Sequence, residues 1–289
     1  MNSRRDISDE IEGTGEYVDS SSRWRLLVDH ETDGASNMAI DEAIVTTVLE
    51  GASPPTLRFY GWSPPCLSLG RSQPFADADL AACRAAGVDV VRRPSGGRAI
   101  LHADELTYSV ALLQGDPLAA GGILESYRRL SQGLLAGLVL LGVQAEQSAS
   151  ARKPMGDVSA VCFEAPSDYE ITVQGRKLVG SAQWRARGGV LQHGTLPLCG
   201  DITRIINYLV LPGVERETQR QFLRTRATTL ETSLGRSVPF AQAASALADG
   251  FAQALDLVLV PGALTTHEKD LAAELRQSRY AAADWTQRT

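Results

Sequence analysis

Residues 167–198 have the sequence SDYEITVQGRKLVGSAQWRARGGVLQHGTLPL, in which strand-length runs are separated by the dipeptides QG at 174–175 and GG at 188–189. Glycine at these places permits the tight turns that connect neighbouring antiparallel strands. The stretch therefore predicts an antiparallel meander, and the segments around it indicate how its sheet is completed.

Strand-like and helix-like segments alternate before the meander. Strand patterns occur at 56–62, 66–72, 88–93, 99–101 and 105–113, and helical patterns at 36–51, 76–87 and 121–142. After the meander the pattern turns helical, with expected helices at 201–209, 215–233, 239–255 and 264–282. The fold class that follows is α/β, with a mixed sheet and a helical C-terminal part.

The composition excludes several classes of protein. The chain has 289 residues, is 44% hydrophobic and carries a net charge of −6, so it can bury a full core. Residues 1–22 hold two arginines and six acidic residues and have little to bury, which predicts a disordered acidic tail. The near-neutral remainder predicts neither nucleic acid nor a membrane as a partner, and the lack of a signal sequence predicts a cytoplasmic protein.

Two residues stand out as candidates for covalent chemistry. Cys162 lies in VCFEAPSDYE at 161–170, and Lys177 follows fifteen residues later across the expected turn at 174–175. Lys177 is one of only three lysines among 28 basic residues, and it lies beside Arg176. An ammonium near a thiol increases the thiolate fraction, and the thiolate is the nucleophile. The alternatives are a buried core cysteine and a solvated turn lysine, whereas Cys83, among alanines, is expected to pack in the core.

Glycines and small residues indicate where a ligand could approach the backbone. Gly96 and Gly97 follow Arg93 and Ser95 within RRPSGGRAILHADELTYS at 92–109, and their amides could bind a carbonyl or a phosphate. The alternative is an ordinary hairpin turn. In the meander, GSAQ at 180–183 and LQHG at 191–194 place Gly180, Ser181, Ala182 and His193 on neighbouring strands. His193 and His102 could each be a base or a hydrogen-bonded structural histidine.

Four separated motifs, in their order along the chain, resemble a known superfamily. They are PTLRFYGWSPPCLSLGRSQ at 55–73, the 92–109 segment, the 161–170 segment, and GRKLVGSAQ at 175–183 followed by LQHG. Together they resemble the lipoate-protein ligase and octanoyltransferase superfamily, and most closely its LipM-type octanoyl-[acyl-carrier-protein]:protein N-octanoyltransferases. The resemblance extends from about residue 24 to 198, and more loosely to YAAADWTQR at 280–288.

The resemblance implies a fold, a site and a reaction. The fold would be that of biotin and lipoate-protein ligase catalytic domains, with the catalytic domain at 23–255 and a helical extension at 256–289. Cys162 would accept the acyl group and Lys177 would lie over the thioester carbonyl. Substrate would bind at Arg93, Ser95, Gly96, Gly97, His102, Gly180, Ser181, Ala182 and His193. Neither a cofactor nor a metal is expected.

The implied partners are octanoyl-acyl carrier protein as donor and a lipoyl domain as acceptor, such as the glycine cleavage H protein or a 2-oxoacid dehydrogenase E2. Three alternatives remain. One is an ATP-dependent lipoate-protein ligase, although residues 102–106 read HADEL where such ligases tend to have HDxGN. Another is an octanoyl amidotransferase between lipoyl domains. The third is an acyl-binding protein without catalytic activity.

Overall fold

The computed structural model describes residues 22–148, 170–211 and 215–288. Its strands form two sheets, a large one in the order β11-β1-β2-β6-β10-β9-β8-β7 and a small one in the order β4-β3-β5. The large sheet consists of Arg23–Val28 (β1), Thr56–Tyr60 (β2), Glu105–Leu113 (β6), Glu146–Gln147 (β7), Ile171–Val173 (β8), Arg176–Ala186 (β9), Gly189–Pro197 (β10) and Val258–Pro261 (β11). It is mixed, because β1 pairs in parallel with β11 and β2, and the remaining pairs are antiparallel.

The predicted meander is confirmed as strands β8, β9 and β10. Gln174 and Gly175 both have positive φ, 50° and 73°, and so do Arg187 and Gly188, at 52° and 93°. This pair of positive φ values is what a two-residue hairpin turn requires, since its twist then matches that of the strands. The turn glycines therefore set the register of the meander.

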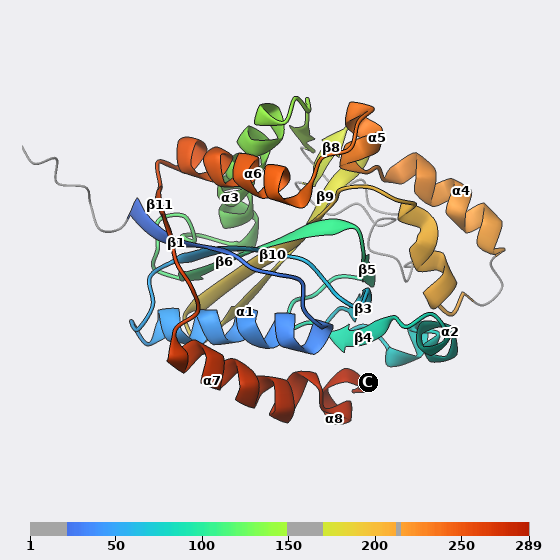
Figure 1. Cartoon of the computed structure of the whole chain (residues 1–289), viewed down its shortest axis with the longest axis horizontal. Helices are drawn as coiled ribbons and strands as arrows, with labels where there is room; N and C mark the ends of the chain where they lie inside the picture. The colour runs from blue at the N-terminus through green and yellow to red at the C-terminus, as the bar shows by residue number, and fades with distance from the viewer. Residues whose placement is uncertain (1–21, 149–169, 212–214, 289) are drawn as a thin grey trace, which may run out of the picture.

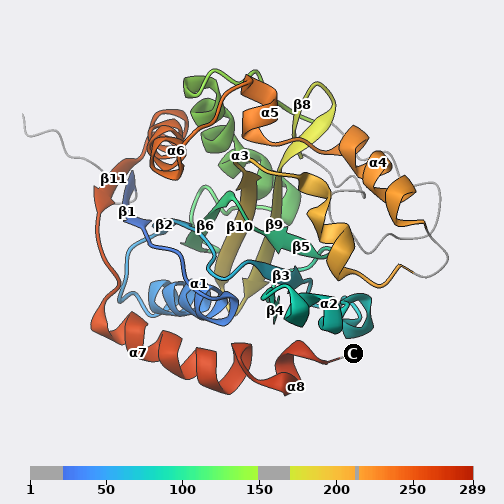
Figure 2. The ribbon, with the colours of Figure 1, turned by 45° about the vertical axis from the view of Figure 1, so that its right-hand side comes forward.

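Helices cover both faces of the large sheet (Figure 1). On one face, Ile123–Leu140 (α3) packs on Phe240–Leu255 (α6), and both enclose the largest apolar cluster against the sheet. On the other face, Gly34–Leu49 (α1) contacts β6 and β10, and Thr266–Leu275 (α7) packs on its outer side. Figure 2 shows the resulting order of layers: α3 and α6, the sheet, α1, then α7.

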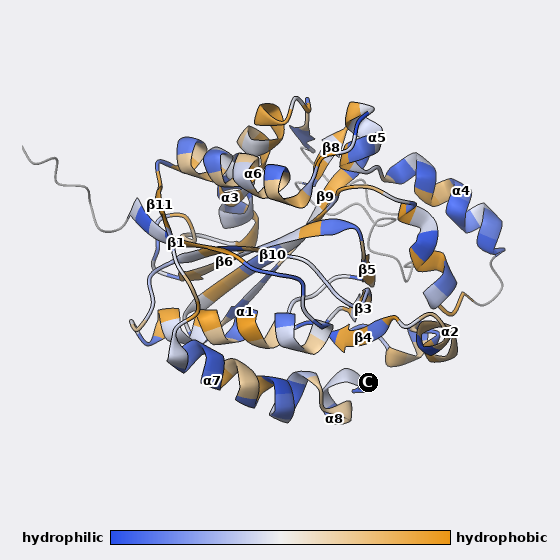
Figure 3. Cartoon of the chain, in the orientation of Figure 1, coloured by the Kyte–Doolittle hydropathy of each residue, from blue (hydrophilic) through white to orange (hydrophobic). Residues whose placement is uncertain are grey.

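The small sheet lies beside the large one and carries the glycine-rich loop. Its strands are Cys66–Leu69 (β3), Asp89–Arg92 (β4) and Ile100–His102 (β5). The 3-10 turn Phe75–Asp77 (η2), the short helix Leu80–Ala85 (α2), the 3-10 segment Ile202–Tyr208 (η3) and Arg216–Arg226 (α4) surround it. Figure 3 shows that α4 is largely hydrophilic on its outer surface.

Several expected helices differ in their bounds for physical reasons. The helix expected at 36–51 begins at Gly34, because the Asp33 side chain accepts a hydrogen bond from the Ser36 amide and caps it. The single helix expected at 76–87 is wrong, since Asp79 caps α2 and Phe75–Asp77 forms a separate 3-10 turn. The helix expected at 215–233 is interrupted after Arg226, where Ala227 pairs with Lys177, and Leu230–Leu234 (α5) follows.

The C-terminal part is helical, as predicted, but also contributes a strand. The segment expected at 264–282 forms α7, a π-helical turn at Arg276–Tyr280 (η4) and a final helix at Ala283–Thr286 (α8). Strand β11 precedes them and extends the large sheet through β1. The domain boundary at 255 remains a prediction, and the predicted tail at 1–22 lies almost wholly outside the described residues.

None of the helices in the described ranges is long and apolar enough to cross a membrane.

Candidate active site

The glycine-rich loop between β4 and β5 lies directly against Gly70, the residue that follows β3. A side chain at Gly70 would place its Cβ 1.9 Å from the Gly97 carbonyl oxygen, so the two backbones touch. Gly97 itself has a φ of 96°, in the region that favours glycine. The backbone contact therefore requires glycine at position 70, and the positive φ favours glycine at position 97 in the loop.

Arg93 is buried and fixes the shape of this loop. Its guanidinium donates to the Gly96 carbonyl at 2.9 and 3.2 Å and to the Arg98 carbonyl at 2.7 Å. It also donates to the Ser68 carbonyl and hydroxyl, at 3.0 and 3.1 Å. A planar cation with five donors can bind several carbonyls at once, which a lysine ammonium does less well. Arg93 thus shapes the loop as well as the site.

The loop closes one side of a cavity of about 310 Å³. This volume lies at the small end of the range for ligand pockets, about 300 to 1,000 Å³. The lining residues come from α1, β2, β3, the loop, β5, β6, β9 and β10. They are Met38, Tyr60, Trp62, Ser68, Arg93, Gly96, Gly97, Arg98, Ile100, His102, Thr107, Gly180, Ser181, Ala182, Gln183, His193, Gly194 and Thr195.

The cavity brings together eight of the nine predicted substrate-binding residues, all except Ser95. Ser95 is connected to these cavity-lining residues through His193, because its hydroxyl lies 2.5 Å from His193 Nε2. Hydrogen-bonding pairs such as Tyr108 with Ser181, 2.7 Å apart, satisfy the polar groups of the neighbouring strands. Segments 87 residues apart, from Gly96 to Gln183, therefore form one wall, as the resemblance implied. What these residues bind remains a prediction.

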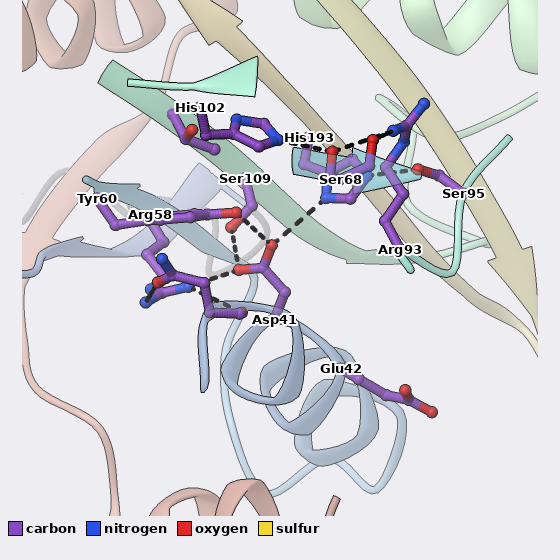
Figure 4. Close-up of polar contacts among 12 residues, drawn as sticks. Asp41, Glu42, Arg58, Tyr60, Ser68, Arg93, Ser95, His102, Ser109 and His193 are labelled. Atoms are coloured by element: carbon purple, nitrogen blue, oxygen red, sulfur yellow. Dashed lines mark hydrogen bonds and ion pairs between the residues drawn. The ribbon is translucent and has the colours of Figure 1, made fainter. Parts of the chain in front are cut away.

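Behind His193 lies a buried carboxylate that the sequence did not single out. Asp41 on α1 accepts hydrogen bonds from Arg58 at 2.8 Å, Tyr60 at 2.8 Å and Ser109 at 2.9 Å, and lies 3.5 Å from His193 Nδ1 (Figure 4). Burial alone would raise the pKa of Asp41, but the hydrogen bond from His193 and the charge of Arg58 hold it below its ordinary value. Asp41 is therefore a carboxylate at neutral pH.

This arrangement assigns the proton on His193. Burial lowers the pKa of His193 below its ordinary value, although Asp41 opposes this effect, so the ring is neutral at pH 7. Because Nδ1 faces the Asp41 carboxylate, it carries the hydrogen, and Nε2 accepts from the Ser95 hydroxyl. The His193 ring therefore links Asp41 on α1 to Ser95 in the glycine-rich loop, which is a structural role.

His102 belongs to a second buried network at the other side of the cavity. Its Nδ1 lies 2.7 Å from Glu105 Oε1 and its Nε2 lies 2.7 Å from Ser68 Oγ. The ring stacks on Trp62 with centroids 4.0 Å apart, and the Trp62 indole donates to Thr107 at 2.7 Å. Both nitrogens and one face of the His102 ring are thus constrained.

Lys177 is buried, and its ammonium forms an ion pair with the buried Glu170. The alternative of a solvated turn lysine is therefore wrong. Its backbone carbonyl accepts from the Thr228 amide at 2.9 Å, which fixes the start of β9. Lys177 does not line the cavity, but Gly180, three residues further along β9, does. Cys162 lies outside the described residues, so the predicted pairing of Cys162 with Lys177 remains a prediction.

The other three cysteines are free thiols with raised pKa values. Cys66 and Cys83 are fully buried, and burial raises the pKa of Cys66 well above its ordinary value and that of Cys83 to about 11. Partial burial and the nearby Asp104 also raise the pKa of Cys199. A thiol with a raised pKa is a poor nucleophile at neutral pH, so core packing of Cys83 is confirmed and none of the three competes with Cys162 on this ground.

Sequence reasoning missed Ser68, Asp41, Glu105 and Arg58 as members of the site. One signal was available for Asp41, since it follows Asn37 by four residues on a helix that is otherwise strongly apolar, so both polar groups lie on one face. Ser68 and Glu105 carried no comparable signal. Within the described ranges, no cluster of three His, Cys, Asp or Glu side chains could hold a metal ion.

Comparison with known proteins places this geometry in a family. Residues 33–252 match the family described as the Lipoyl protein ligase A/B catalytic domain. The chain is 45% identical over 273 residues to octanoyltransferase LipM of Symbiobacterium thermophilum, covering 92% of this chain and 99% of that protein. It is 47% identical over 272 residues to octanoyltransferase LipM of Moorella thermoacetica, covering 92% and 98%.

Two solved structures of lipoate-protein ligases share the fold of this chain. The bipartite lipoate protein ligase of Thermoplasma acidophilum superposes with a TM-score of 0.77 at 22% identity, covering 92% of this chain and 96% of that one. Lipoate-protein ligase A bound with ATP superposes with a TM-score of 0.75 at 23% identity, covering 92% and 98%. At this identity the likeness shows the fold alone.

Proposed function

The chain belongs to the family of Lipoyl protein ligase A/B catalytic domains, and from this we propose that it transfers an octanoyl group from octanoyl-acyl carrier protein to a lysine of a lipoyl domain in lipoate biosynthesis. The observation that carries the proposal is similarity to octanoyltransferases over almost the whole chain, at 45% and 47% identity. The predominantly apolar cavity under the glycine-rich loop supports it, because it offers a small acyl chain a place out of water.

We propose that the transfer proceeds through Cys162. The Cys162 thiol gives up its proton, the thiolate attacks the carbonyl carbon of the donor thioester, and the carrier leaves as a thiol that takes up that proton. The enzyme thioester that results is similar in energy to the donor thioester, so this step needs no ATP. A lysine amine of the lipoyl domain then attacks the same carbon, the amide forms, and Cys162 leaves as a thiol.

Lys177 is suited to stabilise charge in both steps. Each step passes through a tetrahedral intermediate whose oxygen is negative, and a buried cation beside that oxygen lowers its energy more than an exposed one would. Glu170 holds the ammonium in one position and compensates its charge. Gly96 and Gly97 line the cavity, and their backbone amides are the candidates for further donors.

The transferase and the two alternative enzymes differ in what they require. We expect octanoyl carrier protein to octanoylate an apo lipoyl domain in the absence of ATP, as followed by intact-protein mass spectrometry. A requirement for ATP together with free octanoate would instead support a ligase. A requirement for an octanoylated lipoyl domain as donor would support the amidotransferase.

A further inference from the structure

Two cavity side chains and a carboxylate behind them form an ordered chain of hydrogen bonds. Ser68 Oγ lies 2.7 Å from His102 Nε2 (Figure 4), and His102 Nδ1 lies 2.7 Å from Glu105 Oε1. Ser68 and His102 line the cavity, whereas Glu105 lies behind them. All three are at least nine-tenths buried. The set resembles in geometry, though not in sequence order, the serine, histidine and acid arrangement that moves protons in hydrolases.

The neighbouring groups set the direction of the protons when Glu105 is a carboxylate and the His102 ring is neutral. The carboxylate can only accept, so His102 Nδ1 carries the ring hydrogen and donates to Glu105, and Nε2 accepts from the Ser68 hydroxyl. Ser68 Oγ accepts in turn from Arg93 Nη1 at 3.1 Å. Glu105 is held in turn by Thr107 at 2.5 Å and by Thr195.

The register of the large sheet places Glu105 at the end of the sheet at which β9 begins, with β10 between β6 and β9. Gly180 pairs with Thr195, and Thr195 pairs with Thr107 on β6. Glu105 lies two residues nearer than Thr107 to the edge of the sheet at which β9 begins, and β9 begins with Arg176 and Lys177. The His193 network lies further from that end of the sheet, since His193 pairs with Ala182 and Ser109. The strand rise of about 3.3 Å per residue separates the two networks along the sheet.

We propose that Ser68, His102 and Glu105 form a proton relay that removes a proton from the acceptor amine as it attacks the enzyme thioester. The proposal rests on the function proposed above. A neutral lysine amine has two hydrogens on nitrogen, and the amide that it forms has one. A base in the cavity must therefore take one of them.

The proton balance of this step closes within the relay. As the nitrogen–carbon bond forms, the amine proton passes to Ser68 Oγ, and the Ser68 hydrogen passes to His102 Nε2. Glu105 stabilises the imidazolium through Nδ1. When the carbon–sulfur bond breaks, the proton returns through Ser68 to the Cys162 thiolate, which leaves the amide, a thiol and the relay in its starting state.

The similar set formed by Ser95, His193 and Asp41 fits this role less well. Ser95 does not line the cavity. The distance of 3.5 Å between His193 Nδ1 and Asp41 is 0.8 Å longer than the corresponding distance to Glu105. Asp41 is also shared with Arg58, Tyr60 and Ser109, so its charge is already neutralised by a buried guanidinium. Its network holds the loop and α1 together.

The test separates proton removal from all other parts of the reaction. The full-length enzyme is first octanoylated by octanoyl carrier protein, and the loss of the octanoyl group is then timed with two nucleophiles. One is the lysine of an apo lipoyl domain, whose attack needs a base of the enzyme in this proposal. The other is hydroxylamine, a small nucleophile that attacks thioesters in neutral solution without a catalyst, so its reaction does not depend on the relay.

We expect His102→Gln and Glu105→Gln to slow transfer to lysine by about 100-fold, the lower range for acid–base catalysis, and to leave release by hydroxylamine at the native rate. Ser68→Ala should show the same selectivity. The control is His267→Gln, because the exposed His267 makes a similar contact with Glu50, 3.0 Å long, away from the cavity. It should match the native enzyme with both nucleophiles.

Transfer to lysine at the native rate in folded His102→Gln enzyme would overturn the relay. Equal slowing of both nucleophiles would overturn it too, since that pattern indicates a distorted site. Failure of the proposed function has a different signature, because the native enzyme would then form no octanoyl-enzyme at all. Circular dichroism of each variant establishes that it is folded.

Discussion

At the scale of single residues, motifs identified residues that line the cavity, but not the acids behind them. Arg93, Gly97 and His102 lie in one segment, and the structure places all three at the cavity. Asp41 could not be assigned in this way, because it acts through His193, which a distant strand supplies, and a tertiary contact leaves no spacing in the sequence. Glu105 lies only three residues after His102 in the same segment, but that spacing alone did not single it out.

Lys177 offers the most direct prediction at this scale. Lys177→Arg keeps the charge but replaces a compact ammonium with a planar group that would have to fit beside Glu170 in a buried site. We expect octanoyl transfer to fall on the order of 100-fold, the cost of losing one donor to an oxyanion. The rate is measured with octanoyl carrier protein and an apo lipoyl domain.

The matched control is Lys269→Arg, since Lys269 is an exposed lysine on α7. It should transfer at the native rate. Near-native activity of Lys177→Arg would mean that any buried cation suffices, or that Lys177 has no part in the reaction.

At the scale of elements, hydrophobic periodicity and turn residues predicted the strands and helices that their own residues determine. They failed where a strand depends on a partner far away in the sequence. The run at 105–113 became β6 without change, because it contains good strand formers such as Thr107, Tyr108 and Val110 and lies between two other strands. Strands β1 and β11 were not expected. They pair with each other although more than 230 residues separate Arg23 from Val258, and no local pattern reports such a pairing.

The packing of α3 on α6 depends on glycines that allow the two backbones to touch. A Cβ on Gly250 would lie 2.1 Å from the Gly137 amide nitrogen, and backbone cannot yield as a side-chain end can. We expect Gly250→Ala to lower the free energy of unfolding by about 1 to 3 kcal/mol, the usual cost of overpacking. Urea-induced unfolding measures it.

Gly115→Ala is the control for this prediction, because a Cβ there meets nothing within 4 Å. It should leave the unfolding midpoint unchanged. If Gly250→Ala also leaves the unfolding midpoint unchanged, α3 and α6 do not pack as closely as described.

At the scale of the whole molecule, the C-terminal part holds both the first strand and the glycine-rich loop. Glu268 on α7 accepts from both terminal nitrogens of Arg25 on β1, at 2.5 and 2.8 Å, and from Ser53 at 2.9 Å. The indole of Trp285 donates to the Arg92 carbonyl at 2.8 Å, next to Arg93. The end of the chain thus supports the active-site wall.

The Glu268 pair predicts how stability depends on pH. Although burial opposes it, hydrogen bonds from Arg25, the Thr265 amide and Ser53 lower the pKa of Glu268 to about 2, below its ordinary value of 4.5. A lowered pKa stabilises the fold above the unfolded value and ceases to do so as pH falls through the folded value. We expect this contribution, about 3 kcal/mol at neutral pH, to disappear between pH 5 and pH 2.

Glu268→Gln isolates this contribution, because glutamine cannot ionise. The native enzyme should be more stable than the variant at pH 7, and the difference should shrink as the pH falls. A difference that stays constant from pH 7 to pH 3 would show that the ionisation of Glu268 does not contribute to stability.

The central claim is a covalent octanoyl group on Cys162, and intact-protein mass spectrometry tests it most directly. Incubated with octanoyl carrier protein and no acceptor, the native enzyme should gain the mass of one octanoyl group, which neutral hydroxylamine removes. Variants with alanine at Cys66, Cys83 or Cys199 should still be labelled, and Cys162→Ala should be neither labelled nor active. Labelling that persists in Cys162→Ala, or full octanoyl transfer by that variant, would contradict the account.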